Sequence, residues 1–262
     1  MKQIVLPGDL KGSARLELDA KTAHYLIAVR RMRAGDSFEA MDAAGSRFAC
    51  TILSDDPRAA EISLSFLASA APASDERPGL ALRIALVQAL PKGQKFDLIV
   101  RQATELGTAL IVPTITQYCI GAEPADRSSS KFERRTRIIR EAMQQSGSEL
   151  RTEIVPTVEL ADLNDTLERH GFARGASVRV LFHEAGLRGA RPLHDFLSGA
   201  ADAVVVAIGP EGGFSDADYA AFERMGFGVF HAEGPVLRVE TAAIFAISAI
   251  RAIAMERDIW NR

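Results

Sequence analysis

The sequence lacks the cysteine and histidine groupings that metal sites and disulfide frameworks require. Its 262 residues include only two cysteines, Cys50 and Cys119, and five histidines, which are scattered along the chain. None of them shows the short spacing of metal ligands. We therefore expect no metal site, and two free, buried thiols rather than a disulfide.

Long apolar runs are also missing. No stretch approaches the roughly 18–20 apolar residues that a membrane-spanning helix needs. The N-terminus is too short and is interrupted too soon, at Pro7, to act as a signal peptide. We therefore expect a cytoplasmic protein.

A net positive charge is absent as well, since the formal net charge is -3. Phosphate binding is driven largely by Lys and Arg, so the total charge does not favour a nucleic-acid ligand. Two local clusters of cations could nevertheless bind nucleic acid despite the negative net charge. A solvated surface would show the same pattern. The first comprises Arg30, Arg31 and Arg33, and the second Arg127, Lys131, Arg134, Arg135, Arg137 and Arg140.

The chain divides by composition into two domains, at residues 1–72 and 78–262. In the first, short alternating apolar runs predict half-buried strands, with one helix over Thr22–Met32, so a small β-barrel or sandwich is expected. The segment 68–79 is small and polar and contains two prolines, as is typical of a linker. The strands expected in the first domain are 15–18, 37–41, 48–53 and 61–67.

After the linker, strand and helix patterns alternate, which favours an α/β domain of about six strands. Runs such as Ala203–Ile208 are apolar without alternation, so both faces of the sheet should be covered, as in a parallel sheet. Gly107 should end one helix. Ser130 with Glu133, and Ser215 with Asp218, should cap the starts of two more. The expected strands are 82–88, 109–114, 152–155, 178–182, 203–208 and 229–232, and the last helix is expected over 241–255.

Three strand ends are the places to look for a ligand, because open α/β sheets bind ligands beyond the carboxyl ends of their strands. They are Leu181–Glu184, Ile208–Gly213 and Gly234–Arg238. The middle loop holds three glycines, which allow close backbone approach, but it is neither GxGxxG nor a phosphate loop. It fits a nucleoside-type ligand held by backbone groups, or equally a tight turn that only needs glycine. Arg238 before a helix start suits an anion, but an Arg paired with Glu233 or Glu240 would give the same pattern.

The two C-terminal motifs resemble the SPOUT-class methyltransferases and, more narrowly, the RsmE family of small-subunit (16S) ribosomal RNA uridine-N3 methyltransferases. These motifs are Gly209–Gly213 and Val236–Ala242. Three further segments match that family in order along the chain, namely 24–36, 89–107 and 141–147. The chain departs from the family pattern at Arg30, where leucine is usual, after Gly147, and at 232–235, just before the last motif.

The resemblance implies an N-terminal PUA-like β-barrel that binds RNA and a C-terminal SPOUT-type α/β domain with a trefoil knot. Topology rules would exclude a knot, so it cannot be derived from the residues. The resemblance also implies a homodimer, S-adenosylmethionine as cofactor, and 16S ribosomal RNA or the small ribosomal subunit as partner.

The roles of individual residues follow from the same resemblance. The catalytic residues would be Arg238, which stabilises the uracil anion or orients the nucleotide, and Glu211 or Glu240, which accepts the proton. RNA would be held by Arg30, Arg31, Arg33, Lys92, Lys95, Arg134, Arg135 and Arg137. The cofactor would be held by Leu181, Phe182, His183, Ile208, Gly209, Pro210, Glu211, Gly212, Gly213, Gly234, Val236, Leu237, Arg238 and Thr241.

Two rival functions stay open. One is a SPOUT methyltransferase with another RNA target, such as tRNA ribose methylation. The other is a non-catalytic rRNA-binding or assembly protein with a vestigial cofactor site, which the altered segment 232–235 makes conceivable. A dehydrogenase or kinase is disfavoured, because the chain has neither GxGxxG with a ribose-binding acid nor a phosphate loop.

Overall fold

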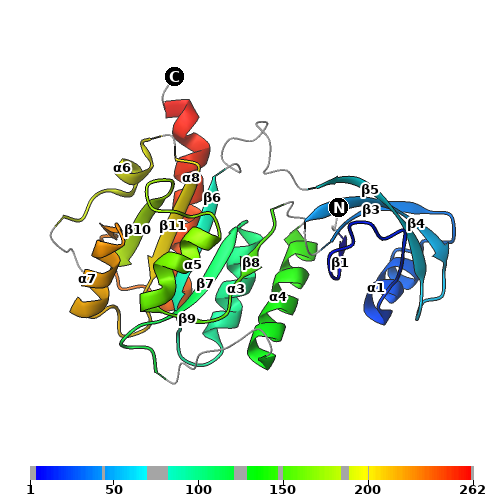
Figure 1. Ribbon diagram of the computed structural model, residues 1–262, viewed down its shortest axis with the longest axis horizontal. Coiled ribbons are helices and arrows are strands. Elements are labelled where there is room, and N and C mark those ends of the chain that lie inside the picture. The colour runs from blue at the N-terminus through cyan, green and yellow to red at the C-terminus, as the bar shows by residue number, and fades with distance from the viewer. Residues whose placement is uncertain are drawn as a thin grey trace. The chain divides into compact units, whose positions relative to one another are not determined.

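A computed structural model of the protein describes residues 4–42, 45–69, 82–120, 129–146, 150–183, 189–199 and 201–260 (Figure 1). The chain divides into two compact units. The first is Met1–Pro72 together with Met143–Arg151, and the second is Ala73–Ala142 together with Thr152–Arg262. The segment Met143–Arg151 clusters with the first unit although it follows residues of the second.

A five-stranded, mostly antiparallel sheet builds the first unit, as the β-rich expectation requires. Its longest strands alternate buried and half-buried residues, so one face closes over a core that includes Phe48, Cys50 and Ile62. The alternation had predicted four of these strands, but the three-residue β1, which pairs in parallel with β3, was missed. The order is β1 (Ile4–Leu6), β3 (Ser37–Asp42), β4 (Ser46–Ser54), β5 (Glu61–Ser69) and β2 (Arg15–Glu17).

The helix of this unit starts earlier and ends earlier than its pattern predicted. It comprises α1 (Ala20–His24) and the π-helical turn η1 (Tyr25–Val29). Asp19 sets the start, because its carboxylate accepts a hydrogen bond from Thr22 N–H at 2.9 Å. The chain then leaves the helix, and Arg31 adopts a φ of 58°, which residues other than glycine rarely adopt.

A seven-stranded sheet forms the centre of the second unit, and every pairing within it is parallel. The seventh strand was missed because β9 has only two residues and shows no periodicity. The path runs β12 (Gly228–His231), β10 (Val178–His183), β11 (Ala203–Ile208), β6 (Arg83–Ala89), β7 (Leu110–Ile115) and β8 (Glu153–Ile154), with β9 (Val158–Glu159) paired to β7.

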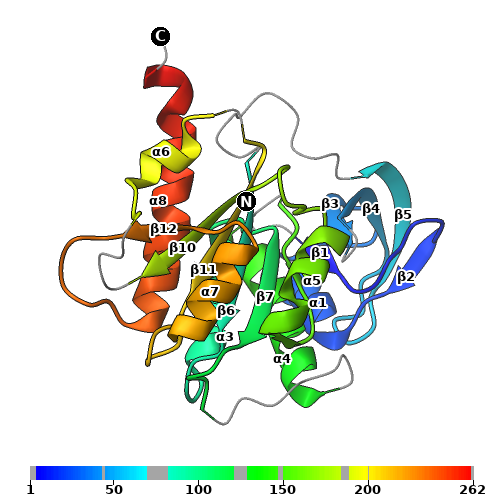
Figure 2. The ribbon, with the colours of Figure 1, turned by 60° about the vertical axis from the view of Figure 1, so that its left-hand side comes forward.

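Helices cover both faces of this sheet, as the apolar runs predicted. All six residues of β11 are buried. One face packs under α5 and α7, whose Leu163, Leu167 and Phe222 join its core (Figure 2). On the other face α8 contacts β6, β11 and α3. The helices are α3 (Lys95–Glu105), α4 (Ser130–Ser146), the 3-10 turn η2 (Leu160–Asp162), α5 (Leu163–Arg169), α6 (Leu193–Leu197), α7 (Asp216–Arg224) and α8 (Val239–Trp260).

The observed helix ends confirm two of the predicted caps and contradict one. Ser215 and Asp218 form the expected capping box at the start of α7. The other box is wrong by one residue, because Ser129, not Ser130, accepts the hydrogen bond from Phe132 N–H. Gly107 follows α3 with a φ of 74°, as expected for a helix stop. Gly147, predicted to close α4, lies outside the described residues.

The two cysteines are both free, but only Cys50 is buried, and burial raises the pKa of its thiol to about 12. Cys119 is only half-buried, so the expectation of two buried thiols is wrong for it, since it lies in the exposed segment after β7. No helix in the described ranges combines the length and apolar character that crossing a membrane demands.

Candidate functional site

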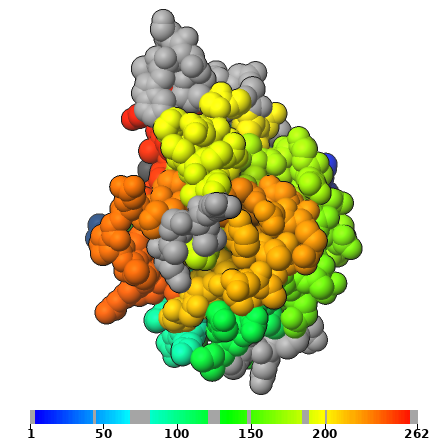
Figure 3. All heavy atoms as spheres, turned by 90° about the vertical axis from the view of Figure 1, so that its left-hand side faces the viewer, coloured from blue at the N-terminus to red at the C-terminus, as the bar shows by residue number. Residues whose placement is uncertain are grey.

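Three predicted loops meet at one edge of the second unit's sheet. They follow β10, β11 and β12, which are neighbours in the order β12-β10-β11. Because these strands are parallel, their carboxyl ends lie at the same edge. The orange surface of α7 and of the segment leading to α8 dominates the face of this unit in Figure 3.

A hollow between the three loops collects most of the residues expected to bind a cofactor. Nine of them line it, namely Phe182, His183, Ile208, Gly209, Pro210, Gly213, Gly234, Val236 and Leu237. The other five, which do not line it, are Leu181, Glu211, Gly212, Arg238 and Thr241. Sequence reasoning missed Phe214, Ala232, Pro235, Val239, Ala242 and Phe245.

Three of the missed residues share a signal that the sequence does carry. Val239, Ala242 and Phe245 recur every three residues at the start of α8, so they lie on one helix face. The ring of Phe245 packs edge-on against Phe182 from β10, with 6.3 Å between the ring centroids. Phe182 also contacts Phe230 from β12 at 4.7 Å. These aromatic contacts give the hollow an apolar wall that suits the ring of a nucleoside.

The glycine loop after β11 leaves no room for side chains. A Cβ at Gly209 would lie 3.3 Å from Gly213 Cα and 3.4 Å from the ring of Phe214. Gly213 has a φ of 70°, and its N–H donates to Pro210 O at 2.9 Å. From the neighbouring β6, the fully buried Gln88 donates from Nε2 to Ala89 O at 2.9 Å and reaches Ile208 O and Gly209 O at 3.5 Å. The backbone of this loop is therefore fixed from both sides.

Glu211 points away from the hollow, into an ion pair. Lys95 Nζ lies 2.6 Å from its carboxylate, and Lys92 N–H donates to the same group at 3.2 Å. Burial acts to raise the pKa of Glu211, but these hydrogen bonds and the charge of Lys95 lower the pKa below its ordinary value. At neutral pH the group is an ionised, weakly basic carboxylate that ties β11's loop to the start of α3.

Arg238 and Glu240 flank the first residue of α8. Arg238 is exposed, and within the described part of the chain neither Glu233 nor Glu240 forms an ion pair with it. The alternative in which Arg238 merely pairs with a neighbouring glutamate is therefore not what the described residues show. Glu240 keeps one carboxylate oxygen, Oε2, buried without a hydrogen-bond partner among those residues. Arg238 is thus available for an anionic ligand at a helix start, whereas Oε2 of Glu240 is buried.

One buried carboxylate joins the glycine loop to the segment after β7. Asp218, which is 5% exposed, accepts from Ser215 N–H at 3.0 Å and from Ser215 Oγ at 2.8 Å. The same carboxylate accepts from Gln117 N–H at 3.3 Å. The Ser–Asp pattern revealed the cap, but nothing local in the sequence pointed to Gln117, 101 residues away.

The cations expected to bind RNA in this unit lie on α3 and α4 and in the loop before α3. Arg134 pairs with Asp97 at 2.6 Å. Arg135 stacks on Phe96, with its guanidinium carbon 4.4 Å from the ring centroid. Burial lowers the pKa of Arg135, as does Arg134, while Asp97 acts in the opposite direction; an arginine nevertheless stays charged in proteins. Arg137 and Lys92 are exposed.

The remaining predicted cations, Arg30, Arg31 and Arg33, lie in the first unit, directly after η1. Arg31 and Arg33 are exposed, and among the described residues Arg33 forms one ion pair, a long one with Asp55 at 3.8 Å. A π-helical turn and a non-glycine residue at positive φ occur side by side here. Both features are costly and concentrate at functional sites.

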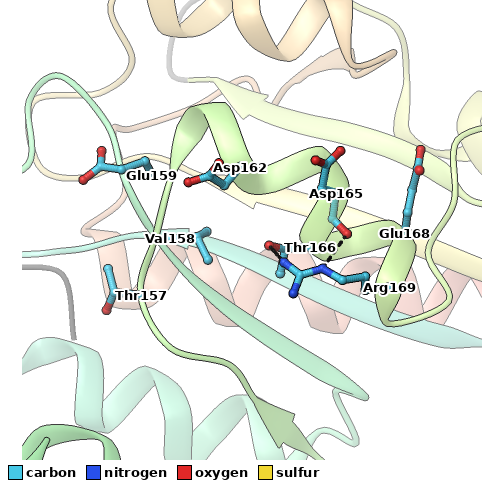
Figure 4. Close-up of a pocket in the computed structure, with 8 residues that line it drawn as sticks. All are labelled: Thr157, Val158, Glu159, Asp162, Asp165, Thr166, Glu168 and Arg169. Carbon is cyan, nitrogen blue, oxygen red and sulfur yellow. Dashed lines mark hydrogen bonds between the residues drawn. The ribbon is translucent and has the colours of Figure 1, made fainter. Parts of the chain in front are cut away.

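A larger hollow lies elsewhere in the second unit and has different chemistry. Its volume is about 750 Å³, against about 100 Å³ for the hollow at the glycine loop. Four carboxylates line it, from Glu159, Asp162, Asp165 and Glu168, while Arg169 turns back to its own helix, to Asp165 O and Thr166 Oγ1 (Figure 4). Such a lining repels phosphate, so size does not make it the nucleic-acid site.

Comparison with known proteins identifies the family of each unit. Residues 78–251 match the RNA methyltransferase domain family, and residues 18–65 match the RNA methyltransferase PUA domain family. The chain is 31% identical to ribosomal RNA small subunit methyltransferase E of Aquifex aeolicus, over 92% of this chain and 95% of that one. It is 27% identical to ribosomal RNA small subunit methyltransferase E 2 of Borreliella burgdorferi, over 97% and 98% of the two chains.

Solved structures share the fold over nearly the whole length. Ribosomal RNA small subunit methyltransferase E of Neisseria gonorrhoeae, solved with S-adenosylmethionine, superposes with a TM-score of 0.74 at 22% identity, over 97% of this chain and 98% of that one. A protein of Legionella pneumophila, also solved with this cofactor, superposes with a TM-score of 0.73 at 27% identity, over 96% of this chain and 97% of that one.

Proposed function

Because the chain belongs to the family of RNA methyltransferases that contains ribosomal RNA small subunit methyltransferase E, we propose that it methylates N3 of a uridine in 16S ribosomal RNA with S-adenosylmethionine. The observation that carries this proposal is the hollow formed by the loops after three adjacent parallel strands. It combines aromatic walls with a glycine loop that excludes side chains, which fits a cofactor of nucleoside type.

In this reaction the bond from the sulfonium to the methyl carbon breaks and a bond from uracil N3 to that carbon forms. The cofactor supplies an already activated methyl group when bound. N3 carries a proton, which must leave at or before transfer, so the chain must align the base and stabilise negative charge on it. No covalent enzyme intermediate is needed.

We assign the charge-stabilising role to Arg238, whose guanidinium is exposed at the edge of the hollow's third loop. The proton acceptor is Glu211 or Glu240. The ion pair with Lys95 and the lowered pKa make Glu211 the poorer base of the two. The unpartnered Oε2 of Glu240 favours that residue. The cofactor contacts come from the strand-end loops, chiefly through backbone groups.

Assembly and location are part of the same proposal. We propose a homodimer, with a trefoil knot built from the strand-end loops, acting in the cytoplasm on 16S ribosomal RNA or the small subunit. Light scattering on the purified protein measures the dimer directly.

Mass mapping of nucleosides tests the reaction. Small-subunit RNA from cells that lack the protein is incubated with the purified chain and S-adenosylmethionine, and we expect new 3-methyluridine at one site. A methylated ribose, or methylation of tRNA alone, would instead indicate another RNA target. No calorimetric binding of S-adenosylmethionine would indicate a non-catalytic RNA-binding protein.

The arginines of the first unit provide a second prediction. Reversing charge at Arg31 and Arg33 to Glu should weaken RNA binding several-fold and lower the salt slope of the binding constant by about two, because each arginine would neutralise one phosphate. Arg15→Glu with Arg58→Glu, in the same unit, is the matched control. If the RNA affinity and its salt slope are unchanged in the Arg31 and Arg33 variant, these two arginines do not bind RNA.

A further inference from the structure

The segment Thr116–Ile120, which follows β7, is held rigidly against the glycine loop. Its chain turns back on itself, with Cys119 N–H donating to Thr116 O at 3.1 Å. Gln117 N–H donates to the buried carboxylate of Asp218, which also holds Ser215. The backbone on both sides of Tyr118 is therefore anchored, although neither the proposed cofactor contacts nor the proposed catalytic groups use this segment.

Tyr118 lies directly on the glycine loop and yet stays open to solvent. A Cβ at Gly212 would lie 3.1 Å from Tyr118 Cβ and 3.4 Å from its Cγ, so only glycine allows the ring to sit there. Tyr118 is nevertheless 45% exposed, and its hydroxyl makes no hydrogen bond within the described residues. A ring that is fixed at its base and partly open to solvent can receive another flat ring.

Positive charge borders the same loop. Glu211, the neighbour of Gly212 in the chain, binds Lys95 Nζ and the N–H of Lys92. The side chain of Lys92 is exposed and forms no ion pair among the described residues. The base of the Tyr118 side chain, the ammonium of Lys95 and the backbone of Lys92 therefore adjoin two consecutive residues of one loop, Glu211 and Gly212, at the strand-end edge where the proposed reaction takes place.

We propose that Tyr118 is a stacking platform for an unpaired nucleobase of the RNA substrate, next to the nucleotide that is methylated, with Lys92 and Lys95 facing the adjoining phosphates. The proposal rests on the proposed function, because N3 of a uridine is reached only when that base is unpaired, and its neighbours then expose their faces too. Aromatic stacking is the usual way in which proteins hold such bases. Tyr118 would thus hold the unpaired strand beside the target without reading its sequence, because every base has a face that stacks.

Three variants separate stacking from structure. Tyr118→Phe keeps the ring, Tyr118→Ala removes it, and Ile120→Ala removes a side chain that is 65% exposed in the same segment but has no aromatic face. On a 16S RNA fragment that carries the target, we expect Tyr118→Ala to weaken binding by about 10-fold or more, the scale of one stacked base. The RNA affinity of Tyr118→Phe and of Ile120→Ala should stay within about twofold of the wild-type affinity, because neither change removes a stacked ring. The salt slope should not change in any of them, because every cation that faces a phosphate is kept.

A double-mutant cycle identifies the partner base. Unpaired nucleotides that flank the target are replaced one at a time by abasic sites. At one position the abasic site should lower the RNA affinity of the wild type as much as Tyr118→Ala does. The same abasic site should not lower the affinity of Tyr118→Ala any further. Wild-type-like binding by Tyr118→Ala, or fully additive losses at every site, would overturn the proposal. So would loss of S-adenosylmethionine binding in Tyr118→Ala, since the ring would then be structural.

Failure of the proposed function gives a different result. If the wild type binds the fragment but transfers no methyl group, the methylation proposal fails, while the stacking cycle is still measured through binding. If the wild type binds no RNA, both proposals fail.

Discussion

Arg238→Ala is expected to slow methyl transfer to 16S RNA by about 10²-fold or more, which is the scale of losing one charge-stabilising group in an active site. Arg238 lies one residue before α8, is exposed, and is paired with neither Glu233 nor Glu240 within the described residues. Its removal therefore disturbs no ion pair between residues that the structure describes. Single-turnover kinetics with saturating S-adenosylmethionine and RNA measure the effect.

Two measurements distinguish a catalytic role from a structural one. Calorimetric affinity for S-adenosylmethionine should stay within a few-fold of the wild type, and Arg238→Lys should recover part of the rate because it restores a positive charge without the planar donors. Arg224→Ala, at the exposed end of α7, is the matched control and should be neutral. A normal rate for Arg238→Ala would remove this residue from the mechanism.

Gly209→Val is expected to lower affinity for S-adenosylmethionine by about 10- to 100-fold, the equivalent of the roughly 1–3 kcal/mol that overpacking costs. The Cβ alone would lie 3.3 Å from the backbone of Gly213 and 3.4 Å from Phe214. A branched side chain must therefore displace the glycine loop, which lines the hollow. Calorimetric titration with S-adenosylmethionine measures the loss.

The control for this variant is Gly199→Val, because Gly199 has nothing within 4 Å of its Cβ position and no positive φ. Thermal unfolding of both variants separates a local change of the loop from a general loss of stability. Equal cofactor affinity in Gly209→Val and the wild type would mean that the cofactor binds elsewhere.

Local rules located the strand ends but not what surrounds them. The apolar runs and glycines were enough to predict β11, its loop and the cap at Ser215, because each depends on neighbours in the chain. Phe245 was missed in the hollow because its role depends on Phe182, which comes from β10 and lies far earlier in the sequence. Short pairings such as β1 and β9 carry no periodicity, since two or three residues cannot show one.

The charged residues were harder to interpret than the apolar ones. The same pattern of arginines fits a solvated surface and an RNA surface, and pattern alone does not separate them. Only the structure shows that Arg134 is engaged by Asp97 and that Arg31 sits at a φ of 58° after a π-helical turn. Likewise, the ion pair of Glu211 with Lys95 joins residues 116 positions apart, so its lowered basicity could not be foreseen.

The carboxylate of Asp218 links two segments that lie far apart in the sequence. One side chain caps α7 and also holds the backbone of Gln117. A substitution of Asp218 would therefore disturb the start of α7 and the segment after β7 together. The segment around Tyr118, by contrast, is held through the backbone N–H groups of Gln117 and Cys119, so exchanging the side chain at position 118 removes none of the hydrogen bonds that hold it.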